Sequence, residues 1–298
     1  MRLASTTISD NIIGQIQQLS QQQAKLQTQV STGQRISKLE DDPAAAGRVL
    51  ALQSEQRAIS QFSSNANRAL ELSQATFSSL QQIKKISDRA TELGTLGTGT
   101  QSSQQTQAYA TETDQLLEQA VQEANSKLGN DSLFAGTAVN VTPFTVTRNA
   151  QGQITAVAYA GNASQTSIPL SSTASVVPGA EPSTIAGLTT FLNTLVSLRD
   201  SLQTGNNAAV STAQTSLITT EDNFVSSLAQ QGAVQMRIEV NQTQQADRSQ
   251  NLQQLISGQV DADMPSTIVQ LNQAQTAYQA SLQSAAKIVK LSLLDYIN

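Results

Sequence analysis

The sequence predicts a mainly α fold, in which both chain ends form a long antiparallel helical bundle or coiled coil. A small β-rich domain is inserted in the middle. Apolar residues recur at helical spacing near both ends, and no proline interrupts residues 44–142 or 183–264. Between them, prolines cluster in one window in which β-branched and polar residues alternate, which is the pattern of strands rather than helices.

The two chain ends carry apolar repeats spaced alternately by four and three residues, as the a and d positions of a coiled coil are. One Gln interrupts each repeat, as polar residues do where they set the register. The N-terminal repeat is Ile12, Ile16, Leu19, Gln23, Leu26 and Val30. The C-terminal repeat is Met264, Ile268, Leu271, Gln275, Tyr278, Leu282, Ala285 and Val289.

These terminal repeats are almost free of charge on their flanks. Residues 1–34 contain three charged residues and residues 264–298 contain three. Since solvated coiled coils usually carry Glu and Lys beside the seam, we expect these flanks to be buried against neighbouring subunits. Burial of each large apolar side chain contributes roughly 1.5–3 kcal/mol, so the ends are expected to become ordered on assembly. The alternative is two helices of a single soluble bundle.

The interior is predicted to contain helices near residues 44–93, 105–128, 185–202 and 208–257. The stretch GTLGTGTQSS separates the first two as a loop. Residues 134–182 read as strands with turns at Asn-Ala-Gln-Gly and Ala-Gly-Asn. The predicted domains are 1–43 with 262–298, 44–137 with 183–261, and a β-rich outer domain at 138–182.

The stretch VSTGQRISKLEDDPAAAGRVL is predicted to join two helices. Gly33 suits a helix end, Asp42 suits an N-cap and Pro43 suits the first helical position. Cation binding or catalysis by Glu40, Asp41 and Asp42 are the alternatives. A second predicted start precedes the last helix, at Asp261-Ala-Asp263-Met-Pro265. The residues assigned to this joint are Gly33, Arg35, Asp41, Asp42, Pro43, Asp261 and Asp263.

The composition of the chain argues against a catalytic function. The 298 residues include no His, Cys or Trp. The chain therefore lacks the commonest general base, the commonest metal ligand and the thiol nucleophile. We therefore predict no catalytic residue, no metal and no cofactor. The net charge of −5 and the lack of a Lys/Arg run argue against nucleic acid and anionic membranes. The 42 Gln leave a partly disordered, low-complexity chain as an alternative.

No stretch of the sequence reaches 18 apolar residues, so no membrane-spanning helix is predicted. The N-terminal segment lacks the long apolar region and the small-residue cleavage site of a Sec signal peptide. We therefore expect no membrane insertion. If the protein leaves the cell, it is expected to do so without a cleaved signal peptide.

Two spaced motifs resemble the flagellin superfamily. The first is Val30-Ser31-Thr32-Gly33-Gln34-Arg35-Ile36 followed by Asp41-Asp42-Pro43-Ala44-Ala45, and the second is the C-terminal segment 261–298. Within the superfamily, Pro43, the Leu133-Phe134-Ala135-Gly136-Thr137 stretch and the ending Leu-Asp-Tyr-Ile-Asn resemble the hook–filament junction proteins. Leu294 and Ser132 depart from that pattern, which leaves a filament flagellin as the alternative.

The resemblance implies an extracellular structural protein of the bacterial flagellum, exported unfolded through the flagellar type III apparatus. It implies that the terminal helices form the inner tube of a homo-oligomeric ring or filament layer. It further implies, as partners, a neighbouring hook-associated protein, flagellin and an export chaperone. A secreted binding module on a helical stalk is a competing interpretation, which would need exposed aromatic residues among Phe134, Phe144 and Tyr159. A carboxylate hydrolase is the third.

Overall fold

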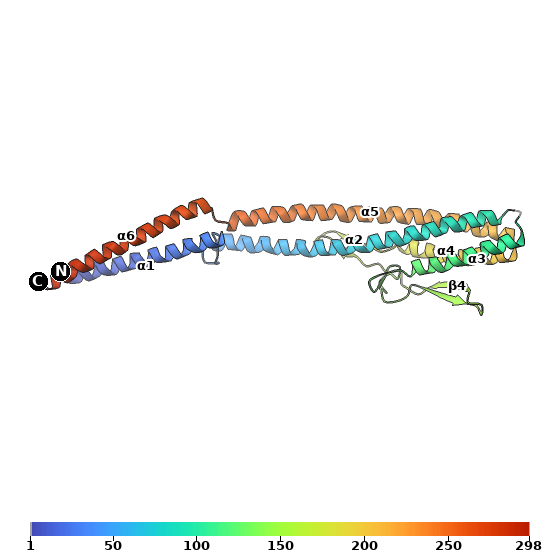
Figure 1. The fold of residues 1–298 in the computed structure, drawn as a ribbon, viewed down its shortest axis with the longest axis horizontal. Helices are drawn as coiled ribbons and strands as arrows, with labels where there is room; N and C mark the ends of the chain where they lie inside the picture. Colours follow the sequence, from blue (N-terminus) through green and yellow to red (C-terminus); the bar gives the residue numbers. More distant parts are fainter. Residues whose placement is uncertain (1, 100, 298) are drawn as a thin grey trace. The chain divides into compact units, whose positions relative to one another are not determined.

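The computed structural model describes the backbone of residues 2–99 and 101–297, and the side chains of residues 10–99 and 101–287. These residues form a mainly helical fold with three small antiparallel sheets (Figure 1). The helices are α1 (Arg2–Thr32), α2 (Pro43–Gly97), α3 (Ser103–Ala124), α4 (Pro182–Thr204), α5 (Asn207–Val260) and α6 (Met264–Ile297). The strands are β1 (Lys127–Leu128), β2 (Asp131–Ser132), β3 (Phe144–Arg148), β4 (Ile154–Tyr159), β5 (Ile168–Pro169) and β6 (Ser175–Val176).

The predicted fold class is confirmed. Each predicted interior helix is present, and the strands lie between α3 and α4. The hairpin β3–β4 turns at residues 149–153, at the predicted Asn-Ala-Gln-Gly sequence. Gly152 has a φ of 85°, which explains why the tightest position of this turn is a glycine.

The chain forms two compact units, Met1–Ala58 with Arg248–Asn298 and Ile59–Asp247. The boundaries between the units therefore lie within α2 and α5, whereas the sequence predicted boundaries near residues 43 and 261. The strands belong to the second unit together with most of the helical bundle. The division into three domains stays a prediction.

In the first unit, α1 and α6 pack side by side and run antiparallel (Figure 1). The pairing follows from the apolar repeats at the two chain ends, which give each helix one face to bury. The same unit contains the beginning of α2 and the end of α5. Arg248 on α5 forms an ion pair with Glu55 on α2 at 2.7 Å.

The second unit contains the main hydrophobic core. Parts of α2 and α5 pack with α3, α4 and the hairpin β3–β4 around fully buried aromatic and aliphatic side chains. The rings of Phe191 and Phe224 meet edge to face, with their centroids 5.3 Å apart. Phe144 on β3 is 1% exposed and packs against Tyr159 on β4. Burial raises the pKa of the Tyr159 hydroxyl, which donates to the carbonyl of Phe134.

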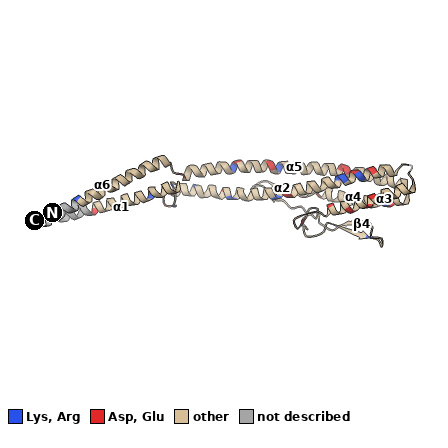
Figure 2. Ribbon diagram, viewed as in Figure 1, with Lys and Arg blue, Asp and Glu red and all other residues tan. Residues whose placement is uncertain are grey.

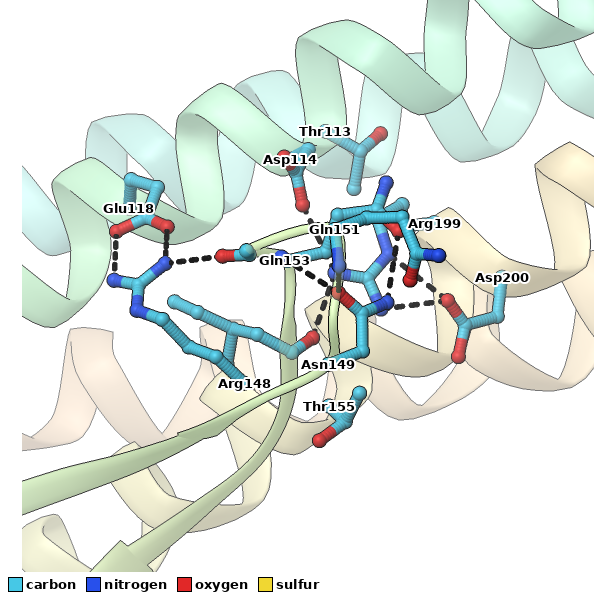
Figure 3. Close-up of polar contacts among 12 residues, drawn as sticks. Thr113, Asp114, Glu118, Arg148, Asn149, Gln151, Gln153, Thr155, Arg199 and Asp200 are labelled. Atoms are coloured by element: carbon cyan, nitrogen blue, oxygen red, sulfur yellow. Dashed lines mark hydrogen bonds and ion pairs between the residues drawn. The ribbon is translucent and has the colours of Figure 1, made fainter.

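A buried arginine attaches the hairpin to the helices. Arg199 on α4 is 2% exposed, and its guanidinium donates to the carbonyl of Ile154 on β4 at 2.7 Å and to Asp114 on α3 at 2.9 Å (Figure 3). It also pairs with Asp200. Burial alone would lower the pKa of Arg199, but these two carboxylates raise it above its ordinary value. At the same end of the hairpin, Arg148, the register partner of Ile154, binds Glu118 in a two-pronged ion pair.

Candidate assembly site

The joint between the terminal helices and the remainder of the first unit is a short antiparallel ribbon. α1 ends at Thr32, and Gly33 takes the left-handed conformation with a φ of 71°. Gln34 then forms an antiparallel bridge with Asp261. The amide of Arg35 donates to the carbonyl of Val260 at 2.6 Å, and the amide of Ala262 donates to that of Gly33 at 2.8 Å. The two linkers that connect the terminal helices to α2 and α5 therefore support each other.

Gln259 on α5 connects the two sides of this joint. The guanidinium of Arg35 donates to its backbone carbonyl at 2.8 Å, and that of Arg48 donates to its side-chain oxygen at 3.0 and 3.1 Å. Arg35 also lies 3.5 Å from the carboxylate of Asp42. The sequence predicted Arg35 as part of the joint but not Gln259 or Arg48, because their partners are more than 200 residues distant in the chain.

Asp42 lies where the sequence predicted a helix cap. Its Oδ1 accepts from the amide of Ala45 at 3.0 Å, and Pro43 begins α2. This hydrogen bond, with a smaller contribution from Arg35, holds the pKa of the Asp42 carboxyl below its usual value. The carboxylate therefore serves the helix start.

Asp41 organises the loop that precedes the cap. Its carboxylate accepts from the ammonium of Lys25 on α1 at 2.8 Å and from the amides of Ser37 and Lys38 at 3.1 and 3.0 Å. The hydrogen bond from Lys25, followed by those from the two amides, holds the pKa of Asp41 far below its usual value. The sequence did not identify Lys25, which attaches this loop to the end of α1.

Asp261 lies in the joint, as the sequence predicted, but its side chain does not cap α6. The Asp261 side chain accepts from Ser257 on the preceding helix, and its backbone belongs to the bridge with Gln34. Asp263 directly precedes α6, and its backbone carbonyl accepts from the amide of Thr267 at 2.9 Å. Its carboxylate makes no hydrogen bond to any residue whose side chain is described. The start of α6 thus differs from that of α2 in lacking a side-chain cap.

The N-terminal repeat lies on the less exposed face of α1, as its spacing predicts. Leu26 is 6% exposed, and the other members are half-buried. Those half-buried members are Ile12, Ile16, Leu19, Gln23 and Val30. The partial burial of this repeat is expected for a two-helix contact, in which only one side of each helix has a neighbour.

In the C-terminal repeat, alternate positions lie on the inner face of the helix pair. At the positions between them, the buried residue comes one residue earlier than the repeat predicts. Half-buried Met264, Leu271, Tyr278 and Ala285 lie on the inner face, as predicted. Between them the more buried residues are Thr267, Ala274 and Ser281, whereas Ile268, Gln275 and Leu282 are exposed. Small residues here allow α1 and α6 to approach closely. Val289 lies outside the residues whose side chains are described.

As a result, large apolar side chains remain uncovered on the helix pair. Ile13 is 54% exposed, Ile268 43%, Val269 55% and Leu282 43%. Figure 2 shows that charged side chains are sparse on the described parts of α1 and α6 and more frequent on α2, α3 and α5. An apolar surface without flanking charge is typical of a protein–protein contact.

The aromatic residues of the β segment do not form an exposed patch. Phe134 is fully buried, Phe144 is 1% exposed and the hydroxyl of Tyr159 is bound internally. These three residues therefore do not supply the exposed aromatic surface that a binding module would need.

The described residues contain no helix with the length and hydropathy of a membrane span.

Comparison with known proteins supports a flagellar relationship. Residues 4–138 match the family described as the bacterial flagellin N-terminal helical region. No curated protein sequence matches the chain.

Solved structures of hook-associated proteins have a similar fold. FlgL from Bacillus cereus aligns with a TM-score of 0.60 and 20% identity, over 70% of this chain and 99% of that one. FlgL from Xanthomonas campestris aligns with a TM-score of 0.56 and 14% identity, over 69% of this chain and 99% of that one. A protein from Vibrio parahaemolyticus assigned as flagellar hook-associated aligns with a TM-score of 0.66 and 16% identity, over 74% of this chain and 100% of that one. Residues 4–138 are thus similar to the bacterial flagellin N-terminal helical region, and the fold is similar to that of flagellar hook-associated proteins.

Proposed function

We propose that this chain is a structural adaptor of the bacterial flagellum that joins the hook to the filament. One observation supports this most directly: α1 and α6 pair with each other yet leave Ile268, Val269 and Leu282 substantially exposed on a surface with few charges. A helix pair of this kind gains further apolar burial when it packs against other subunits. The fold shared with hook-associated proteins is consistent with this role.

The mechanism is helix packing without a chemical step. The terminal helices provide the lateral and axial contacts of a homo-oligomeric ring, with a hook-associated protein and flagellin as neighbours. The carboxylates of the joint support this architecture, since Asp41 and Asp42 bind Lys25 and backbone amides. Export through the flagellar type III apparatus with a chaperone, followed by an extracellular location, belongs to the same proposal.

Electron microscopy of the purified chain, alone and with isolated hooks, tests this function. We expect a protein that forms no filaments on its own, binds the ends of hooks and then accepts flagellin. Failure to bind hooks under conditions in which a known junction protein does so would contradict the proposal.

A filament flagellin is the second candidate, because residues 4–138 match the flagellin N-terminal helical region. The same micrographs discriminate between the two functions. Long filaments formed by this chain alone would identify it as the filament subunit, whereas hook ends bearing a single added layer would identify it as the adaptor.

A further inference from the structure

An exposed leucine in the joint stands out from the other apolar side chains of the first unit. Leu39 is 68% exposed, the highest value among the large hydrophobic residues whose side chains are described. It lies in the loop that Asp41 organises through its hydrogen bonds with Ser37, Lys38 and Lys25. Because this loop is already ordered, insertion of Leu39 into a partner would cost little conformational entropy.

The second unit contains a pocket suited to such a side chain. It has a volume of about 410 Å³ and lies between α2 and the loops on either side of the hairpin β3–β4. Its apolar lining includes Leu72, Leu133, Val139, Ile168 and Val177. A concave site of this size is in the range of small-ligand pockets, so it has room for a leucine side chain.

The loop and the pocket each carry one basic and one acidic side chain, which could combine with those of the other across a contact. Lys38 and Glu40 flank Leu39 and lie 3.4 Å apart, with side chains 73% and 77% exposed. Arg68 and Asp131 line the pocket, lie 3.5 Å apart and are 76% and 44% exposed. Both ion pairs are loose and solvated, so each can exchange its partner at little cost. Lys38 would face Asp131, and Glu40 would face Arg68.

We propose that Leu39 of one copy occupies the Leu72–Val139–Val177 pocket of a second copy. This inference rests on the proposed function, and it specifies one contact between neighbouring subunits. The leucine and the pocket are different surfaces, so the contact is heterologous. Repetition of such a contact produces a ring or a helical array rather than a closed dimer, as a flagellar layer requires.

Cysteine cross-linking tests the contact directly, since the natural chain contains no cysteine. Chains with Leu39→Cys are mixed with chains with Val139→Cys under oxidising conditions, at high concentration in solution and on isolated hooks. The controls are Leu50→Cys and Val141→Cys, which are exposed and therefore at least as accessible as Val139 but do not line the pocket. We expect the 39–139 pair to yield the mixed disulfide dimer well above all control pairs in at least one setting. Yields equal to those of the controls in both settings would overturn the inference.

Substitutions provide an independent readout of self-association, by sedimentation of the natural chain and its variants. Leu39→Asp is expected to weaken self-association about tenfold, because a large apolar side chain is lost from the contact. Exchange of the loop charges in the double variant Lys38→Glu with Glu40→Lys is expected to weaken it less. Adding Arg68→Glu with Asp131→Lys should restore it. Absence of this rescue together with an unaffected Leu39→Asp variant would contradict the contact.

The outcomes separate this inference from the proposed function. Hook binding without the 39–139 cross-link overturns the contact and leaves the adaptor function intact. The cross-link without hook binding supports the contact and contradicts the adaptor. Cross-linking of residue 39 to a hook protein, with no dimer of this chain, assigns the loop to a different partner and overturns the inference.

Discussion

Asp41 and Asp42 are adjacent in the sequence but stabilise different parts of the joint. Asp42 caps α2, whereas Asp41 binds the end of α1 and the loop between them. We expect Asp42→Ala to loosen the first turn of α2, because the amide of Ala45 loses its acceptor. Hydrogen exchange of the amides at residues 44–48 should accelerate. Asp42→Asn, which retains an acceptor oxygen, serves as the control and should change exchange much less. Equal protection in both variants would contradict the cap.

The depressed pKa of Asp41 makes the order of this loop sensitive to acid. Because the folded pKa lies below the unfolded value of about 4, the stabilisation is fully present above that value. It is lost as the pH falls further towards the folded pKa. The amide NMR shifts of Ser37 and Lys38, which donate to this carboxylate, should therefore remain constant down to pH 4 and change only below it. In Asp41→Asn this acid transition should disappear. A midpoint at the usual aspartate value would contradict the hydrogen bonds.

Arg199 is the buried charge on which the hairpin depends. Arg199→Met preserves much of the volume but removes the donor to the carbonyl of Ile154 and the partner of Asp114. We expect the second unit to lose about 2 kcal/mol, the typical cost of a buried polar group left without a partner. The control is Arg148→Met, since Arg148 is exposed and its solvated ion pair with Glu118 should contribute much less to the stability of the unit. Denaturant unfolding of both variants measures the difference, and equal losses would contradict this assignment.

At the level of elements, the sequence predicted helices more reliably than contacts. Gly33 and Pro43 locate the end of α1 and the start of α2, since each satisfies a local backbone requirement. The inner face of α6 was only half predicted. Apolar periodicity selects Ile268 and Leu282, whereas the close approach of α1 favours small residues such as Thr267 and Ala274. Periodicity detects an apolar stripe but not which edge of it a neighbour covers.

Other features of the site have no local signature at all. Gln259 and Arg48 meet only after α2 and α5 have been brought together, and Arg199 reads in the sequence as one polar residue in a helix. Asp261 and Asp263 resembled the start of α2 because both lie shortly before Pro265, but the backbone of Asp261 is used in the bridge with Gln34. Such features follow from tertiary pairing and could not be derived from spacing.

On α6, the residues that pack against α1 differ from the apolar residues that stay exposed, so helix pairing and assembly can be tested separately. Leu271 faces α1, whereas Leu282 is 43% exposed. We expect Leu271→Asp to weaken both the α1–α6 pair and assembly on hooks, because a buried charge without a partner is costly. Leu282→Asp should leave the pair intact and impair assembly alone. Far-UV circular dichroism reports the helices, and binding to hooks reports assembly. Normal assembly of both variants would show that this face is not a polymer contact.

At the scale of the whole molecule, the two units differ in how much apolar volume they bury. The largest fully buried side chains among those described all belong to residues 59–247, including Phe134, Phe191 and Phe224. In the described part of the first unit, the buried hydrophobic residues are three alanines together with Leu26, Val49 and Leu252. Since buried apolar area is the main source of stability, the first unit is expected to unfold at the lower temperature.

Calorimetry of the intact chain should therefore show two transitions rather than one. Leu271→Asp should move only the lower transition, because it acts on the α1–α6 pair. Phe224→Ala should move the upper transition, with a loss of about 3–5 kcal/mol for a large aromatic removed from a core. Hydrogen exchange during heating assigns each transition to its residues. A single transition shifted by both substitutions would mean that the units unfold together. Two transitions would leave the terminal helices free to rearrange on assembly while residues 59–247 stay folded.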